Sequence, residues 1–267
     1  MSASPPGGPL RVDRRDDGIV VLTLDLPDRR NAMTGELTAA WGATIAGLRG
    51  DRSVRAIVVT GEGSAFCSGG DLSWIAESPD LTVDAIRDRM LPFYRTWLSI
   101  RELEAPSIAA VNGPAVGAGL CLALACDIRY AARGARLSAP FTQLGMHAGM
   151  AATFLLPEAI GMAAARDLLL TGRAVDADEA LRLGLVSAVF EPGELYDGAL
   201  SAAARIAGAG PIATRLTKAG LRAGGHRSLE EALQFEALAQ PVTFATDDLR
   251  EGLAASRDRR TPNFTGR

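Results

Sequence analysis

The sequence predicts an α/β protein with a helical C-terminal region, and three observations support this fold class. The apolar runs at 54–60 and 107–111 have the composition of strands that are covered on both faces of a sheet. Each run ends at a glycine-bearing corner that leads into a second apolar segment with the character of a helix. From residue 193 onward the apolar spacing is helical throughout.

The length of the chain fits one large core with a small appended region. It has 267 residues and a mass of 27.9 kDa, and single domains stop growing at about 250 to 300 residues. We expect a flexible N-terminal tail over 1–9, a sheet-bearing core over 10–192 and a C-terminal helical region over 193–267. The tail has neither the charged nor the apolar segment of a signal peptide.

Composition and charge exclude several classes of partner. The net charge is −3 and the basic residues are scattered among acidic ones, so no basic face is offered to a nucleic acid or an anionic membrane. The three cysteines stand in apolar surroundings, which predicts free thiols, no metal site and a reduced, cytoplasmic setting. The apolar run 107–126 is interrupted by Asn112, Pro114 and three glycines, which argues against a transmembrane span.

The first elements follow from turn and capping signals. Segments 10–14 and 19–24 flank Asp16-Asp17-Gly18 and predict a hairpin. Thr34 has the hydroxyl of a helix cap, and the helix that follows carries one apolar stripe formed by Leu37, Trp41, Ile45 and Leu48. A strand on either side of this helix makes a parallel, right-handed crossover the default.

The later elements are predicted in the same way. Segment 82–104 predicts a long helix interrupted at Pro92, whose stripe of Met90, Phe93, Tyr94, Trp97 and Leu98 is more typical of core than of an acyl pocket. Short strands are expected at 128–131, 135–138 and 186–190, and helices at 163–170, 176–183, 195–207, 212–221, 229–246 and 249–256.

Two glycine corners carry the chemical prediction. The first runs from Gly61 to Asp71 and precedes a helical start at Leu72, and the second lies around Gly117. Consecutive parallel strands end at the same edge of a sheet, so the two helix starts place free backbone N–H groups near each other. Two such donors that converge on one oxygen form an oxyanion hole. The alternative is a pair of tight strand-to-helix turns without a site.

Several motifs in order resemble the crotonase, or enoyl-CoA hydratase/isomerase, superfamily. They are PDRRNAM at 27–33, FCSGGDL at 66–72, AAVNGPAVGAGLCLALACDI at 109–128, LTGRAVDADEALRLGLVSAVF at 170–190 and ATDDLREGLAASRDRRTPNF at 245–264. The resemblance covers essentially the whole chain. It implies a crotonase-like spiral of ββα units with a C-terminal helical region, assembled as a trimer or as a hexamer made of two trimers.

The resemblance also implies a ligand, an acyl-CoA thioester, with no further cofactor because coenzyme A is part of the substrate. The oxyanion donors fall on the amides of Gly70 and Ala118. Coenzyme A would pass along Gly70, Asp71, Leu72 and Ser73, with Ala32 near its adenine. Arg30 would meet a phosphate, or is simply a solvated loop charge.

The acid and base positions depart from the family pattern. A hydratase of this family uses two glutamates, and the matching positions here hold Cys121 and Phe141. Neither side chain suits proton transfer, because Phe141 has no titratable group and a buried thiol stays neutral. His147 is the candidate replacement base. Cys121 as a nucleophile is an alternative, and Ser68, Thr142 and Gln143 are candidates for binding a polar substituent.

Two classes of function stay open. The first is an enzyme of fatty-acid or related acyl-CoA metabolism, which would be a lyase, isomerase or hydrolase that uses the oxyanion hole with an unusual base. The second is a catalytically silent acyl-CoA-binding or carrier protein. The missing glutamates argue against standard hydration.

Overall fold

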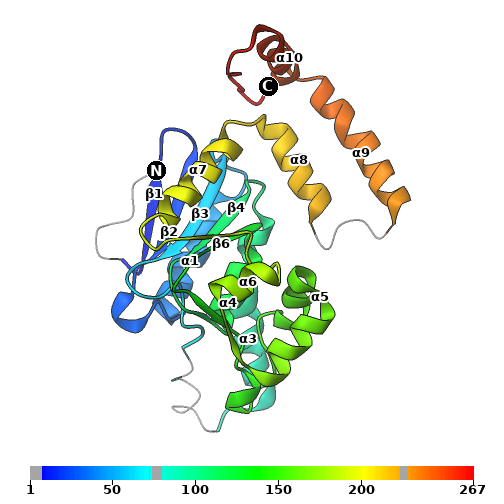
Figure 1. The fold of residues 1–267 in the computed structure, drawn as a ribbon. Helices are drawn as coiled ribbons and strands as arrows, with labels where there is room; N and C mark the ends of the chain where they lie inside the picture. Colours follow the sequence, from blue (N-terminus) through cyan, green and yellow to red (C-terminus); the bar gives the residue numbers. More distant parts are fainter. Residues whose placement is uncertain (1–7, 72, 74–79, 223–227) are drawn as a thin grey trace.

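The computed structural model describes residues 8–71, 73, 80–222 and 228–267. Its centre is a six-stranded sheet with the order β1-β2-β3-β4-β6-β9 (Figure 1). The strands are β1 (Leu10–Arg14), β2 (Ile19–Leu24), β3 (Ala56–Gly61), β4 (Ser107–Val111), β6 (Ile128–Ala132) and β9 (Ala188–Phe190). Every neighbouring pair is parallel except the β1–β2 hairpin. The predicted α/β class, the hairpin and the parallel crossover are confirmed.

Alternate residues of the central strands pack in two different apolar clusters. On β2, Val20, Leu22 and Leu24 belong to one cluster, whereas Ile19 and Val21 belong to the other. Successive side chains of a strand point to opposite faces, so the sheet is buried on both sides. This arrangement explains why the strand sequences are continuously apolar and do not alternate with polar residues.

Helices cover both faces of the sheet. Helices α1 (Gly35–Leu48) and α3 (Val83–Leu98) pack on each other, with the rings of Trp41 and Trp97 stacked at 5.0 Å. The Thr34 hydroxyl accepts a hydrogen bond from the Leu37 amide at 3.2 Å, which confirms the predicted cap. Helix α7 (Leu195–Ala207) covers the opposite face (Figure 1).

One expectation about the helices was wrong, and a second was confirmed. The predicted interruption at Pro92 does not occur, because α3 continues through it to Leu98. Pro92 lies on the exposed side of the helix, where water can satisfy the carbonyl that loses its N–H partner. The helix expected at 163–170 forms the second part of α5 (Ala152–Thr171), after a kink at Gly161, where φ 75° and ψ 162° are not helical.

A second, three-stranded sheet with the order β5-β7-β8 lies beside the first. Its strands are β5 (Ala115–Val116), β7 (Arg136–Ser138) and β8 (Ala174–Asp176). Strands β5 and β8 were not predicted because they are too short for a periodic pattern. The fully buried helix α4 (Ala118–Ala125) follows β5, and α6 (Ala177–Arg182) follows β8. Single 3-10 turns lie at Pro27–Arg29, Ser99–Glu102 and Thr142–Leu144.

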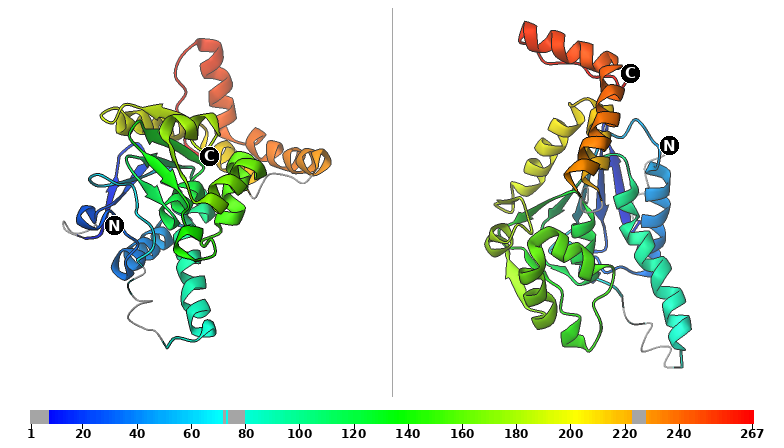
Figure 2. Two further views of the ribbon diagram at one scale, coloured as in Figure 1. Left: turned by 60° about the horizontal axis from the view of Figure 1, so that its bottom comes forward. Right: turned by 90° about the vertical axis from the view of Figure 1, so that its right-hand side faces the viewer.

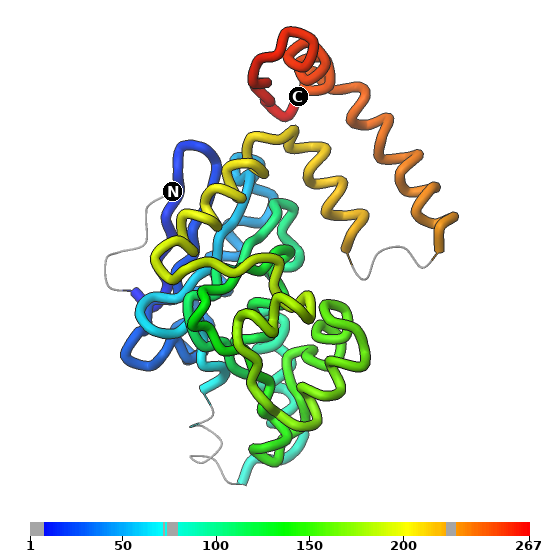
Figure 3. Tube along the Cα trace, viewed as in Figure 1, coloured from blue at the N-terminus to red at the C-terminus, as the bar shows by residue number. Residues whose placement is uncertain are grey.

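The chain leaves the core after α7. Helices α8 (Pro211–Leu221) and α9 (Leu229–Phe244) lie side by side, and α10 (Asp247–Asp258) follows at the far end, away from the sheet (Figures 1 and 2). The tube in Figure 3 shows the same separation along the yellow-to-red part of the trace. Helix α9 buries no residue within the chain. The domain boundary at 193 stays a prediction.

Two further expectations concern the N-terminal tail and the absence of a transmembrane span. Residues 1–7 of the predicted tail lie outside the described residues, and the Pro9 carbonyl accepts a hydrogen bond from the Asp25 amide at 2.8 Å. Among the described residues, none of the helices has the length and hydropathy needed to cross a membrane.

Candidate active site

One buried amide side chain holds together the loops at the carboxyl end of β2 and β3. Asn31 is fully buried. Its Oδ1 accepts a hydrogen bond from the Leu26 amide at 2.9 Å, and its Nδ2 donates to the carbonyls of Glu62 and Ala65 at 3.0 and 2.8 Å. The asparagine of the PDRRNAM motif is therefore an anchor that fixes the first glycine corner.

The segment after Asn31 pairs with this corner as a short piece of sheet. The Ser68 amide donates to the Arg30 carbonyl at 2.9 Å, and the Met33 amide donates to the Gly69 carbonyl at 2.8 Å. The second of these bonds belongs to an isolated parallel bridge between Met33 and Gly70. The backbone of the first corner is thus held on one side along 68–70.

The second corner is built on a backbone that favours glycine. Gly117 has φ 56° and ψ −115° and immediately precedes the first turn of α4. Its amide donates to the Ser138 carbonyl at 2.9 Å, and the Val116 amide donates to the Cys67 carbonyl at 3.0 Å. The second bond ties this corner directly to the first.

The two corners are in contact, as the sequence predicts. A Cβ atom on Gly69 would lie 2.7 Å from the Val116 carbonyl oxygen and 3.5 Å from the Ala118 amide nitrogen. Within the described residues, neither the Gly70 nor the Ala118 amide donates to a turn, loop or side-chain acceptor. Adjacent N–H donors of this kind suit an oxygen that gains negative charge.

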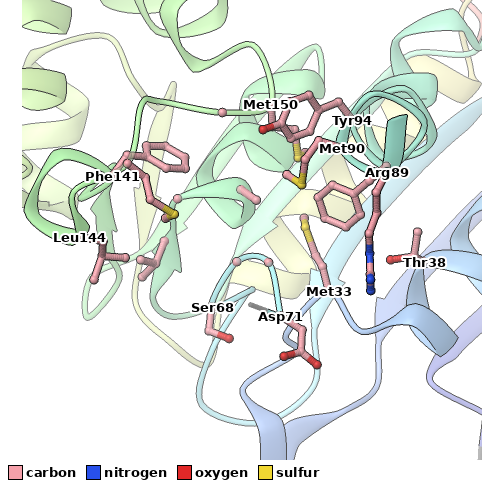
Figure 4. Close-up of a pocket in the computed structure, with 18 of the residues that line it drawn as sticks. Met33, Thr38, Ser68, Asp71, Arg89, Met90, Tyr94, Phe141, Leu144 and Met150 are labelled. Carbon is pink, nitrogen blue, oxygen red and sulfur yellow. The ribbon is translucent and has the colours of Figure 1, made fainter. Parts of the chain in front are cut away.

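Both corners open into a cavity of about 660 Å³, a size typical of small-molecule sites. Figure 4 shows Tyr94 beside Met150 on one wall, Phe141 and Leu144 on the opposite wall, and the loop between Ser68 and Asp71 below them. The remaining wall is mostly apolar and includes Met33, Met90, Phe93 and Met146. The cavity can hold an apolar group with one end at the two amides.

Among the described residues that line the cavity, Asp71 supplies the carboxylate. Its Oδ1 accepts a hydrogen bond from the Ser73 amide at 3.1 Å, and its Oδ2 lies 3.0 Å from a guanidinium nitrogen of Arg29. The hydrogen bonds from Ser73, and after them the charge of Arg29, lower the pKa of Asp71. A carboxylate with a lowered pKa is a weak base, so Asp71 is suited to fixing its own turn.

Cys121 and Phe141, which the resemblance places where a hydratase carries glutamates, lie in different surroundings. The Cys121 thiol is buried beneath the cavity wall, where its Sγ lies 3.7 Å from the Gly149 carbonyl, and burial raises its pKa to about 12. This thiol is neutral and has little nucleophilic character. Phe141 lines the cavity, with its ring about 3.6 Å from the position of a Cβ on Gly117.

The structure places the other candidates in different ways. His147 lines the cavity and is exposed, with its Nδ1 2.7 Å from the Ala148 carbonyl. Ser68 also lines the cavity. The side chains of Thr142 and Gln143 instead bond to carbonyls at the end of α5, at Leu169 and Thr171, and do not line the cavity.

The residues expected along coenzyme A lie at the edge of the site. Ser73 and Asp71 line the cavity, whereas Arg30 and Ala32 lie outside its wall on the segment that pairs with 68–70. The Arg30 side chain is exposed. Leu72 lies outside the described residues.

Several polar residues of the cavity wall were not predicted from the sequence, namely Thr38, Arg89, Tyr94 and Thr96. The helical spacing predicts Tyr94 in a core stripe, and Trp97 in that stripe is indeed fully buried. Met90, Phe93 and Tyr94 lie on the part of α3 that faces the cavity. A polar phenol within an otherwise apolar helical stripe was the sequence signal that could have pointed to Tyr94 as a cavity residue.

Comparison with known proteins decides the family. A model described as enoyl-CoA hydratase/isomerase matches residues 14–267. The chain belongs to the enoyl-CoA hydratase/isomerase family. This family relationship confirms the resemblance to the crotonase superfamily and fits the observed fold.

Individual members of the enoyl-CoA hydratase/isomerase family match along nearly their full length. The chain is 38% identical over 255 residues to the (E)-benzylidenesuccinyl-CoA hydratase of Thauera aromatica, covering 93% of this chain and 96% of that protein. The crystal structure of an enoyl-CoA hydratase from Bacillus anthracis superimposes with a TM-score of 0.91 at 33% identity, covering 97% and 100% of the two chains. An enoyl-CoA hydratase from Mycobacterium smegmatis gives 0.88 at 31% identity, covering 96% and 98%.

Proposed function

We propose that the protein binds an acyl-CoA thioester and stabilises its enolate with the N–H groups of Gly70 and Ala118. The observation that carries this proposal is the contact between the two glycine corners, with Ala118 N 3.5 Å from the position of a Cβ on Gly69. The name of the Thauera relative, a hydratase of a CoA ester, supports the same class of ligand.

The chemistry of a thioester fits two converging amides. When the α-carbon loses a proton, negative charge moves onto the carbonyl oxygen, and this charge is absent in the ground state. Donors aimed at that oxygen therefore stabilise the transition state more than the substrate. Each is worth about 3 kcal/mol in a site that excludes water. This chemistry requires no cofactor beyond the coenzyme A of the substrate.

Binding of the coenzyme A portion is proposed along the first corner. Ser68, Gly70, Asp71 and Ser73 line the cavity on that side. We propose that the pantetheine chain passes over them, that the adenine lies near Ala32 and that a phosphate meets the exposed Arg30.

The proposed reaction class is that of an acyl-CoA lyase, isomerase or hydrolase with an unusual proton carrier. Cys121 and Phe141 stand where a hydratase carries glutamates, and His147 lines the cavity as a candidate base. The second candidate is a silent acyl-CoA binder. It is favoured by the same absence of glutamate at those two positions.

Binding is tested with two ligands that differ at one oxygen. Titration calorimetry with butyryl-CoA and with its thioether analogue, which lacks the carbonyl oxygen, isolates the contribution of the two amides. We expect the thioester to bind about tenfold more tightly, which corresponds to about 1.4 kcal/mol. Equal affinities would exclude the amides as the carbonyl site, and absence of binding would exclude the acyl-CoA proposal.

Activity is tested by proton exchange. Butyryl-CoA is incubated in deuterated water with the wild-type protein and with His147→Ala, and deuterium at the α-carbon is followed by NMR. Exchange in the wild type supports an enzyme, and its loss in His147→Ala shows that His147 takes part in proton transfer. Tight binding without exchange supports the silent binder. Rapid hydration of crotonyl-CoA would contradict the inference drawn from Cys121 and Phe141.

Exposed apolar side chains on α9 support assembly as a trimer or a dimer of trimers. Leu229, Leu233 and Leu238 are 77%, 51% and 75% exposed in the single chain. Apolar side chains gathered on one helix without an intramolecular partner are typical of a surface that another chain covers. We propose that α9 forms part of the contact between copies. A cytoplasmic location is proposed from the free cysteines.

A further inference from the structure

The Tyr94 hydroxyl lies beside the place that the first glutamate would occupy. A Cβ atom on Gly149 would stand 2.6 Å from this hydroxyl oxygen. The carbonyl of the same Gly149 is the group that the Cys121 thiol contacts, at 3.7 Å. The phenol and residue 121 therefore meet at one short stretch of backbone.

The local backbone leaves room for this hydroxyl. Residue 149 is a glycine, and any larger residue there would collide with the phenol oxygen. The next two residues, Met150 and Ala151, both have a positive φ, of 51° and 57°. A positive φ in residues other than glycine costs energy, and it persists only where the surrounding packing holds it. Backbone of this kind is often found at functional sites.

The hydroxyl is available to a ligand. Tyr94 lines the cavity and is half-buried, and Figure 4 shows it on the wall opposite Phe141. The Met150 backbone makes a hydrogen bond to the phenol oxygen that lowers the pKa of Tyr94. A bond of this kind uses the oxygen as an acceptor and leaves the O–H hydrogen for a ligand.

We propose that Tyr94 exchanges a proton with the α-carbon of the bound acyl group, in the role that a glutamate fills elsewhere. This inference rests on the proposed acyl-CoA function. In one direction the phenol O–H bond breaks and its proton forms the α C–H bond, while the enolate electrons return to the carbon. In the other direction the phenolate removes the α-proton, and the C–H electron pair becomes the enolate held by the two amides.

The protonation state of Tyr94 fits this role. Burial raises its pKa above the ordinary value of 10.0, the Met150 backbone opposes this shift, and the nearby Cys121 adds to it. Near pH 7 the group is therefore a neutral phenol that can donate. Because a thioester enolate is a much stronger base than a phenolate, transfer to the α-carbon is downhill.

The pH dependence of exchange separates this role from a structural one. Removal of the α-proton needs the phenolate, whose fraction rises about tenfold per pH unit below the pKa. We expect the exchange rate of butyryl-CoA to rise about tenfold per unit between pH 7 and 9 in the wild type. In Tyr94→Phe we expect the rate to fall at least 100-fold at pH 9 and to lose this slope.

The controls keep the ring and the fold in place. Tyr130→Phe makes the same change on β6, away from the cavity, and is expected to leave exchange within twofold of the wild type. Butyryl-CoA binding to Tyr94→Phe is expected to stay within threefold. If Tyr94→Phe fails to fold, Gly149→Ala provides a second test, because its methyl group displaces the hydroxyl.

Each outcome decides the inference. Exchange within threefold of the wild type in Tyr94→Phe, with the pH slope retained, overturns it. A wild-type protein that binds butyryl-CoA but exchanges no α-proton up to pH 9 also overturns it, while acyl-CoA binding stands. A protein that binds no acyl-CoA overturns both this inference and the proposed function.

Discussion

A Cβ atom on Gly119 would lie 2.1 Å from the carbonyl oxygen of Cys67. That oxygen already accepts a hydrogen bond from the Val116 amide at 3.0 Å. Helix α4 therefore starts in direct contact with the loop that follows β3, and this contact holds the two corners of the site together. A side chain at residue 119 would separate them.

Substitution of Gly119 is expected to damage both stability and binding. Gly119→Ala forces backbone apart, and overpacking of this kind costs about 2–3 kcal/mol in the free energy of unfolding, measured by urea denaturation. Butyryl-CoA binding should weaken as well. Gly47→Ala is the matched control, since a Cβ there meets nothing within 4 Å in helix α1, and it should be neutral or stabilising. Equal stability of the two variants would contradict the contact.

A carboxylate restored at position 141 is expected to create hydration. Phe141→Glu places a proton-transferring group on the cavity wall, and such groups contribute about 100-fold or more. We expect hydration of crotonyl-CoA, followed by loss of the enoyl absorbance, to rise at least tenfold above the wild type. Phe141→Gln has nearly the same shape without an acid. A glutamine variant as active as the glutamate variant would show that space, and not proton transfer, limits the reaction.

The three thiols are expected to be unreactive in the folded chain. Cys67, Cys121 and Cys126 are all buried, and burial raises the pKa of each to about 12. Thiolate is the reactive form, so Ellman's reagent at pH 8 should detect no thiol in the native protein and three in urea. Leu253→Cys adds a thiol at a site that is 64% exposed and should give one rapid reaction. Rapid labelling of the wild type would contradict this burial.

The same thiols make stability depend on alkaline pH. An unfolded cysteine ionises near pH 9, whereas the folded Cys121 keeps its proton up to about pH 12. Between these values the unfolded chain binds fewer protons, so the free energy of unfolding falls by about 1.4 kcal/mol per pH unit for each thiol. Urea denaturation of Cys121→Ala should show a shallower fall than the wild type. Identical slopes would rule out a contribution from this thiol.

The ion pair between Lys218 and Asp127 is expected to hold α8 on the core. The Lys218 side chain is 8% exposed, and its Nζ lies 2.8 Å from Asp127 and 2.9 Å from the Ala105 carbonyl. Lys218→Met leaves Asp127 without its cation and should lower the free energy of unfolding by about 2–4 kcal/mol. Arg250→Ala removes an exposed pair with Asp247 and should change it by less than about 1 kcal/mol. Similar losses in both variants would contradict this reasoning.

Assembly is expected to depend on helix α9. The wild type should sediment as three or six chains of 27.9 kDa. Leu233→Glu puts a charge on an exposed apolar position of α9 and should shift the mass toward one chain. Gln234→Glu adds the same charge at the neighbouring position, where Gln234 already bonds to Glu230, and should leave the mass unchanged. A monomeric wild type would contradict the proposal.

Much of the fold is encoded in short stretches of sequence. The hairpin around Asp16-Asp17-Gly18, the Thr34 cap and the glycines at 69 and 117 follow from local rules of turns, caps and backbone angles. The meeting of the two corners was also predictable, because parallel strands end at one edge of a sheet. These features depend on neighbours within a few residues or on chain topology alone.

Tertiary structure decided what local patterns leave open. The sequence placed Tyr94 in an apolar stripe, but only packing shows that its hydroxyl reaches Gly149, 55 residues away in the chain. In the same way, α3 passes through Pro92 because that side of the helix faces solvent. A local pattern specifies which residues share a face of an element. What that face meets depends on long-range packing, which no window of the sequence contains.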